Sequence, residues 1–415
     1  MVKASRLHVP HPPARPGDRP DFDYVRISAA GAVARPEITV AARDIEALAV
    51  DMVRVLDDEQ RAVGPWNPHL DPQELQVGLR HMLLTRLFDE RMQRTQRQGK
   101  ISFYMKSSGE EAVSVAAAMA LRPDDMLFPS YRNQGLQVAR GRGLVDLMCQ
   151  LLSNTHDMCK GRQMPVMYHW RSGNIFSISG NLATQFPQAV GWAMAAAIKG
   201  EDRIAASWLG EGSSAEADFH YALTFAAVYQ APVILNVVNN QWAISTFQGF
   251  AGGEQRSFAA RGPGHGIPGI RVDGNDFLAV YAVTQWAAER ARRGAGPTLI
   301  ELVTYRVSAH STSDDPARYR PKEEWHAWPL GDPIARLEQH LIGLGEWSAE
   351  RQEALRQELE AHIAACWKES VSYGTYSEGP SLDPATMFED VFKEMPTHLA
   401  RQRDELKALL KSRGS

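Results

Sequence analysis

The segment spanning residues 203–245 constrains the fold more than any other part of the chain. Two short apolar runs, Ile204–Leu209 and Val233–Val238, lack helical spacing, and polar turn residues follow each of them: Gly210-Glu211-Gly212 and Asn239-Asn240. Short apolar runs bounded in this way are typical of buried parallel strands. The small-residue stretch Ala215–Tyr229 between them is typical of a helix. Strand, helix and strand in this order predict a right-handed βαβ unit.

Two polar residues of this unit predict a ligand site. Glu211 and Asn240 are separated by about one βαβ unit, so both are expected at the carboxyl ends of nearby parallel strands, where open α/β sheets bind ligands. A carboxylate and an amide oxygen are hard donors suited to Mg²⁺. Glycines permit the sharp turn, and the free N–H groups of the next helix favour a phosphate. Either motif alone is usually an ordinary turn, but together they favour a pyrophosphate held through Mg²⁺.

The whole chain divides into three regions by composition and pattern. Residues 1–70 are rich in proline and are expected to form an extended N-terminal arm. Residues 71–330 are expected to form one α/β domain, because helical stretches such as Glu110–Leu121 alternate with apolar runs such as Leu299–Val303. Residues 331–415 are expected to form a C-terminal helical region. The predicted fold is therefore α/β, with a doubly wound, mostly parallel sheet, an extended N-terminal arm and C-terminal helices.

Capping signals predict several helix boundaries. Asp71-Pro72-Gln73-Glu74 combines an acidic cap, a proline at the first helical position and an acid three residues after the cap. Leucine and methionine follow at helical spacing, and Gly99 can end this helix. Ser348 is a candidate cap for a later helix, and Met387–Leu410 predicts a pair of short helices at the end of the chain.

Composition excludes several classes of partner. The 45 basic and 49 acidic residues leave a net charge of −4, so no basic excess favours nucleic acid. The three cysteines form no CxxC pair, which argues against a zinc site or a disulfide framework. No apolar run approaches the roughly 20 residues of a membrane-spanning helix, and the first twenty residues lack a signal-type apolar core. We therefore expect no nucleic-acid or membrane partner and a cytoplasmic location.

Further stretches carry a resemblance to a known family. They are ISFYMKSSGEEA from Ile101, PSYRNQG from Pro129, KGRQMPVMY from Lys160, SISGNLATQFPQAVGWA from Ser177 and TYRVSAHSTSDDPARYR from Thr304. Together with the segment described first, they make the chain resemble alpha subunits of the branched-chain 2-oxo acid dehydrogenase (2-oxoisovalerate dehydrogenase) decarboxylase component. The resemblance implies a thiamine-diphosphate-binding fold.

The resemblance also implies roles for individual residues. Glu211, the Asn240 side chain and the backbone carbonyl of Trp242 would ligate Mg²⁺. The residues that would contact thiamine diphosphate are Tyr131, Arg132, Gly180, Leu182, Gly212, Ser213 and His310, and His310 would also be catalytic. Ser179, Asn181, Thr184 and Gln185 match the positions of a potassium site. Tyr131, Arg132 and His310 also fit ordinary roles, as a packing residue, an ion-pair residue and a loop histidine.

Three positions depart from the family pattern. Val238 stands where animal mitochondrial relatives carry an arginine that reaches the diphosphate. Arg132 and the metal are therefore expected to balance more of the phosphate charge. Trp242 replaces a common tyrosine, which a backbone ligand should tolerate. Gly180-Asn181 replaces Ser-Pro, which changes the expected hydroxyl contact and the potassium geometry.

The resemblance implies half of an active site rather than a complete enzyme. Thiamine diphosphate would supply the chemistry that decarboxylates a 2-oxo acid, and the acyl group would pass to the lipoyl group of an acyltransferase component. A separate beta subunit would complete the site in an α₂β₂ heterotetramer. A branched-chain 2-oxo acid is the expected substrate and a bacterial cytosol the expected compartment. Two alternatives stay open: a pyruvate or acetoin dehydrogenase alpha subunit, and a non-catalytic scaffold subunit of the same fold.

Overall fold

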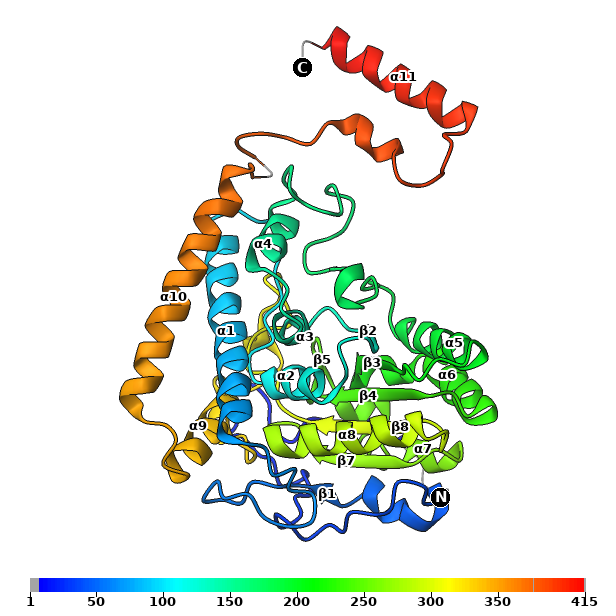
Figure 1. Ribbon diagram of the computed structural model, residues 1–415. Coiled ribbons are helices and arrows are strands. Elements are labelled where there is room, and N and C mark those ends of the chain that lie inside the picture. Colours follow the sequence, from blue (N-terminus) through cyan, green and yellow to red (C-terminus); the bar gives the residue numbers. More distant parts are fainter. Residues whose placement is uncertain (1–6, 376, 414–415) are drawn as a thin grey trace, which may run out of the picture.

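A six-stranded, wholly parallel β-sheet forms the centre of the computed structural model, which describes residues 7–375 and 377–413 (Figure 1). The strand order is β1-β7-β8-β4-β3-β2. In this order the strands are Met52–Val53, Gly269–Asp273, Thr298–Val303, Val233–Asn239, Ala205–Gly210 and Met126–Phe128. A separate antiparallel pair, β5 (Trp242–Ala243) and β6 (Thr246–Phe247), follows β4. The predicted doubly wound sheet and its neighbouring strands β3 and β4 are confirmed.

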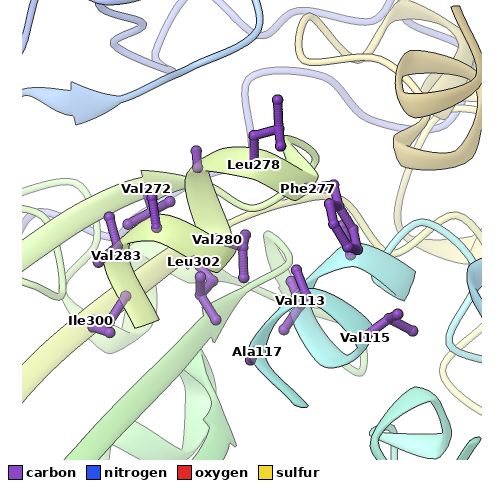
Figure 2. Close-up of a cluster of buried hydrophobic side chains, with 14 of the residues drawn as sticks. Val113, Val115, Ala117, Val272, Phe277, Leu278, Val280, Val283, Ile300 and Leu302 are labelled. Carbon is purple, nitrogen blue, oxygen red and sulfur yellow. The ribbon is translucent and has the colours of Figure 1, made fainter. Parts of the chain in front are cut away.

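Helices cover both faces of the sheet because successive strand residues point to opposite faces. On one face, α2 (Glu111–Ala120) and α8 (Phe277–Arg292) pack against Ile300 and Leu302 of β8 (Figure 2). On the other face, α5 (Gln185–Ile198) and α6 (Ala217–Tyr229) share a cluster with Leu299 of the same strand. Both faces are therefore dry, as the continuous apolar runs predict.

A long helix, α1 (Pro72–Arg97), packs between the sheet domain and the C-terminal region. Its capping box is complete: the Asp71 side chain accepts from Glu74 N–H, and the Glu74 carboxylate accepts from Asp71 N–H. Gly99 follows the helix with a φ of +72°, as predicted for a helix end. The helix packs with α4 (Leu144–Leu152) and α10 (Ala349–Ser372), and Ser348 caps α10 through Arg351 N–H.

The remaining elements are four α-helices and seven 3₁₀ helices within the described residues. They are the α-helices α3 (Gln134–Ala139), α7 (Arg261–Gly264), α9 (Pro333–Gly343) and α11 (Thr397–Ser412), and the 3₁₀ helices η1 (Ala42–Ala49), η2 (Arg171–Gly173), η3 (Glu211–Ala215), η4 (Gln248–Ala251), η5 (Pro316–Arg318), η6 (Glu324–Ala327) and η7 (Pro384–Phe388). In Figure 1, α11 projects from the rest of the molecule, and it buries none of its residues. Within residues 7–375 and 377–413, no helix is both long and apolar enough to cross a bilayer.

Three sequence expectations need correction. The N-terminal arm is not extended throughout, because residues 42–49 form η1 and the fully buried Met52–Val53 pairs with β7 as the edge strand β1. The helix expected to start at Ala215 starts at Ala217, because the 3₁₀ turn η3 separates it from the glycine turn. The predicted C-terminal pair of helices is present as the 3₁₀ helix η7 and the α-helix α11, but the pair begins at Pro384 and ends at Ser412 instead of spanning Met387–Leu410.

Candidate cofactor site

A cavity of about 530 Å³ opens at the carboxyl ends of β3 and β4. It brings together residues that the sequence analysis took from distant parts of the chain. The predicted site residues in its lining are Tyr131, Arg132, Ser179, Gly180, Asn181, Leu182, Gln185, Glu211, Gly212, Ser213, Asn240, Trp242 and His310. Thr184 lies outside the lining. Polar groups from five segments of the chain thus share one cavity with an apolar wall.

Glu211 has the feature expected of a cation ligand. It is the first residue of η3, directly after β3, and is only 1% exposed. Its Oε2 accepts from Asn240 N–H at 3.3 Å, whereas its Oε1 is buried and has no hydrogen-bond partner among the described residues. Burial raises the pKa of Glu211 to about 7, although Arg306 and Arg132 oppose the shift. A buried carboxylate oxygen without a donor is costly unless a cation binds it, so this residue fits a divalent ion.

Asn240 and Trp242 provide the other predicted ligand atoms. The Asn240 amide Nδ2 donates to Glu110 Oε1 at 2.8 Å, and its Oδ1 accepts a long bond of 3.4 Å from Trp242 N–H. Gln241 and Ile244, on either side of Trp242–Ala243, have φ values of +75° and +54°. Left-handed backbone is unfavourable for such residues and is characteristic of functional loops. The strand end is therefore held in an unusual conformation at the predicted metal position.

The donor set distinguishes the kind of metal. Among the described residues, no group of three or more His, Cys, Asp or Glu side chains is placed to hold an ion. One carboxylate with amide and carbonyl oxygens instead fits Mg²⁺, which also uses substrate phosphates and water as ligands.

Arg132 supplies a fixed positive charge to the cavity. Its side chain is 5% exposed, and its two Nη atoms donate to the carbonyls of Lys106 at 2.5 Å and His310 at 2.9 Å. Its Nε lies 3.6 Å from Glu110 Oε1. Arg132 is thus not a surface ion-pair residue, and a buried guanidinium at the cavity wall suits an anionic ligand.

His310 is a neutral donor in this arrangement. Its Nδ1 lies 3.2 Å from Arg132 Nη2, and because a guanidinium only donates, Nδ1 must accept and the proton must be on Nε2. Burial together with Arg132 and Arg306 lowers the pKa of His310 to about 3. Tyr131 packs edge-on against the imidazole, with ring centroids 5.9 Å apart. His310 therefore presents an uncharged N–H rather than a cation.

Close packing next to the predicted metal position requires a glycine at position 212. A Cβ on Gly212 would lie 2.4 Å from the Ala243 Cβ, which has no flexible end to move aside. The backbone of the glycine turn therefore lies directly against the strand that follows Asn240. Gly212 and Ser213 both line the cavity, so this turn can approach a ligand closely.

The predicted potassium residues form a local loop. Asn181 N–H donates to Ser179 Oγ at 3.1 Å, and Thr184 Oγ1 donates to the Asn181 carbonyl at 3.2 Å. Gln185 Nε2 donates to the Trp208 carbonyl, which leaves Gln185 Oε1 buried without a partner. That oxygen is compatible with a cation, but the potassium site stays a prediction.

The sequence analysis missed several lining residues. The apolar wall adds Phe103, Met105, Met164, Met167, Ile244, Phe247 and Phe250 to Leu182 and Tyr131. Glu110 was also missed, although it lies within the Gly-Glu-Glu that precedes a predicted helix. A carboxylate at a helix start was the available signal, but the sequence did not show that Glu110 meets Asn240. Burial raises the pKa of Glu110 to about 7, despite the opposing effect of Arg132.

The parallel sheet, the glycine turn and the cavity at the carboxyl ends of the strands are typical of an α/β protein that binds a ligand at this edge of its sheet. Residues 79–377 match the family described as dehydrogenase E1 component, and residues 3–43 match the one described as 2-oxoisovalerate dehydrogenase E1 alpha subunit N terminal. The chain belongs to the dehydrogenase E1 component family.

Individual proteins that the chain resembles belong to one kind of enzyme within this family. The chain is 60% identical to the 2-oxoisovalerate dehydrogenase subunit alpha of Pseudomonas aeruginosa over 97% of this chain and 98% of that protein. It is 39% identical to the mitochondrial alpha subunit of the same enzyme from Mus musculus, over 88% of this chain and 81% of that protein. The Dictyostelium discoideum mitochondrial alpha subunit is 40% identical over 85% and 79% of the two chains. Within the family, the chain therefore belongs with the 2-oxoisovalerate dehydrogenase alpha subunits, as the sequence resemblance implied.

Proposed function

We propose that this chain is the alpha subunit of a branched-chain 2-oxo acid dehydrogenase that decarboxylates 2-oxoisovalerate and similar acids. Its E1 family membership implies thiamine diphosphate as the cofactor. The observation that carries the proposal is the buried, unpartnered Oε1 of Glu211 beside the Asn240 amide at the ends of adjacent strands. A non-catalytic scaffold has no need of such a carboxylate, whose burial is costly without a cation.

The cofactor would be held from its diphosphate end. Mg²⁺ would bind Glu211, the Asn240 amide oxygen and the Trp242 carbonyl. The diphosphate would lie against Arg132, Tyr131, Gly212, Ser213 and His310, while Gly180 and Leu182 would contact the rest of the cofactor. Val238 lines this cavity where an arginine was expected from some relatives, so Arg132 is the main cationic side chain there. A potassium ion at Ser179, Asn181, Thr184 and Gln185 is part of the proposal.

The chain's own residues contribute binding and orientation. Thiamine diphosphate, when bound, supplies the carbanion chemistry of decarboxylation. His310 would donate its Nε2–H to an oxygen of the substrate or acyl group, since its Nδ1 is occupied by Arg132. The apolar wall that includes Phe103 and Leu182 would hold a branched aliphatic chain and exclude water.

An alpha subunit implies a beta subunit as its partner. The stoichiometry of the assembly and its further partners are part of the proposal. We expect an α₂β₂ heterotetramer in which the beta subunit completes the active site. The acyl group would then pass to the lipoyl group of an acyltransferase component. A bacterial cytoplasm is the proposed location, in keeping with the Pseudomonas relative.

Two measurements test the proposal. The chain, co-expressed with its beta subunit, should turn over 2-oxoisovalerate faster than pyruvate or acetoin. Glu211→Ala should abolish Mg²⁺-dependent cofactor retention without preventing assembly. Preference for pyruvate or acetoin would identify the corresponding alternative enzyme, and an absence of Mg²⁺-dependent cofactor binding would favour the scaffold.

A further inference from the structure

Glu110 is a cavity carboxylate to which the proposed function assigns no role. It occupies the N-cap position of α2, is 3% exposed, and makes no capping bond with its side chain. The side chain instead lines the cavity. The adjacent Glu111 differs, because it pairs with Arg86 at 2.7 Å and accepts from Gly109 N–H. The two consecutive glutamates at the start of α2 therefore lie in different surroundings: Glu110 lines the cavity, whereas Glu111 pairs with Arg86.

Glu110 contacts two predicted site residues at once: the predicted metal ligand Asn240 and the predicted cofactor contact Arg132. Its Oε1 accepts from Asn240 Nδ2 at 2.8 Å and lies 3.6 Å from Arg132 Nε. In its ionised form the Glu110 carboxylate only accepts, so it selects the nitrogen end of the Asn240 amide and not the oxygen end. The amide oxygen must then point elsewhere, and among the described residues it accepts only the long bond from Trp242 N–H. That oxygen is the atom a cation needs.

We propose that Glu110 is a positioning residue that fixes the Asn240 amide with its oxygen, rather than its nitrogen, available to the divalent cation. The inference rests on the proposed metal site and deepens it. Without an acceptor at position 110, the amide can rotate by 180° and present its NH₂ group, which no cation binds. Groups that orient metal ligands in this way typically change metal affinity by about 10- to 100-fold when removed.

Two substitutions separate orientation from charge. Glu110→Gln removes the charge but keeps a carbonyl oxygen that accepts from the Asn240 amide. Glu110→Met has similar size and no comparable acceptor. If Glu110 acts by orienting Asn240, the glutamine variant retains metal affinity and the methionine variant loses it. If Glu110 acted only by attracting the cation, both variants would lose affinity equally.

The measurement is Mn²⁺ binding to the assembled alpha–beta enzyme with thiamine diphosphate present, followed by the electron paramagnetic resonance signal of free Mn²⁺. We expect Glu110→Gln to remain within about threefold of the wild-type dissociation constant and Glu110→Met to be weaker by about tenfold or more. Glu111→Gln is the matched control, because it removes the neighbouring buried carboxylate outside the cavity. Its Mn²⁺ affinity should be unchanged.

The same substitution in a second variant, Asn240→Asp, distinguishes loss of orientation from a general packing defect. In Asn240→Asp both ends of the side chain are oxygens, so orientation no longer matters, and Glu110 faces a like charge. Adding Glu110→Met to Asn240→Asp should therefore weaken Mn²⁺ binding much less than it does in the wild-type background. Equal weakening in both backgrounds, equal loss in the Gln and Met variants, or no loss in Glu110→Met would each overturn the inference. Failure of the wild-type enzyme to bind Mn²⁺ would instead overturn the proposed metal site itself.

Discussion

Proton release on metal binding provides a sharp test of the site, and its size follows from the structure. Burial holds the pKa of Glu211 at about 7 in the metal-free chain. A cation must bind the carboxylate form, so binding displaces any proton present. A group with this pKa is protonated in about nine molecules in ten at pH 6 and in about one in ten at pH 8. Mg²⁺ should therefore release about 0.9 proton at pH 6 and about 0.1 at pH 8 from Glu211.

Isothermal titration in two buffers of different ionisation enthalpy gives this count. Mg²⁺ is titrated into the alpha–beta assembly with thiamine diphosphate, and the titration into cofactor alone is subtracted. Because Glu110 has a similar pKa, Glu110→Gln is used to leave the Glu211 proton alone in the count. The apparent Mg²⁺ affinity should also rise by about tenfold from pH 6 to pH 8. A proton count near zero at pH 6, or equal affinities at the two pH values, would refute the assignment of Glu211 as the buried ligand.

Three further predictions concern residues around the cavity. Gly212→Ala should weaken Mg²⁺ retention because the new Cβ would lie 2.4 Å from the Cβ of Ala243. Adding Ala243→Gly should restore Mg²⁺ retention in a metal-binding assay. A defect that persists in the double variant would rule out the steric cause. Arg132→Lys should raise the thiamine diphosphate dissociation constant by at least about tenfold, since a lysine cannot reproduce the anchored guanidinium, and calorimetry showing unchanged affinity would contradict this. Burial raises the pKa of Asp89 to about 6. The protonated side chain therefore stabilises the folded protein at low pH, and this stabilisation is lost as the pH rises through 6. Relative to Asp89→Asn, the wild-type free energy of unfolding should fall by about 1.4 kcal/mol from pH 5 to pH 8, and unfolding temperatures that shift in parallel would contradict it.

The central βαβ unit could be predicted from the sequence because local pattern and tertiary role agree there. The runs Ile204–Leu209 and Val233–Val238 are buried on both faces, so their apolar character is continuous and unambiguous. The register of β3 on β4 then brings Glu211 to Asn240 without further information. The resemblance supplied the other predicted cavity residues, whose individual roles stay predictions.

Elsewhere the decisive contacts join residues far apart in the chain. Glu110 meets Asn240 across 130 positions, and no local pattern records that contact. Strand β1 is two residues long, so Met52–Val53 becomes a strand only because β7 offers an edge. The apolar wall of the cavity likewise draws Phe103, Met164 and Phe250 from separate loops. Sequence patterns reveal elements with their own periodicity, whereas these features arise only when the chain folds.

Because α11 projects from the rest of the molecule, the end of the chain is structurally independent of the predicted cofactor cavity. None of its residues lines the cavity or enters a buried cluster, and a 16-residue helix has little stability of its own. Cutting the chain within residues 377–396 would remove this helix and leave every cavity wall in place. Changes in length or sequence beyond that point should therefore leave the predicted cofactor cavity intact.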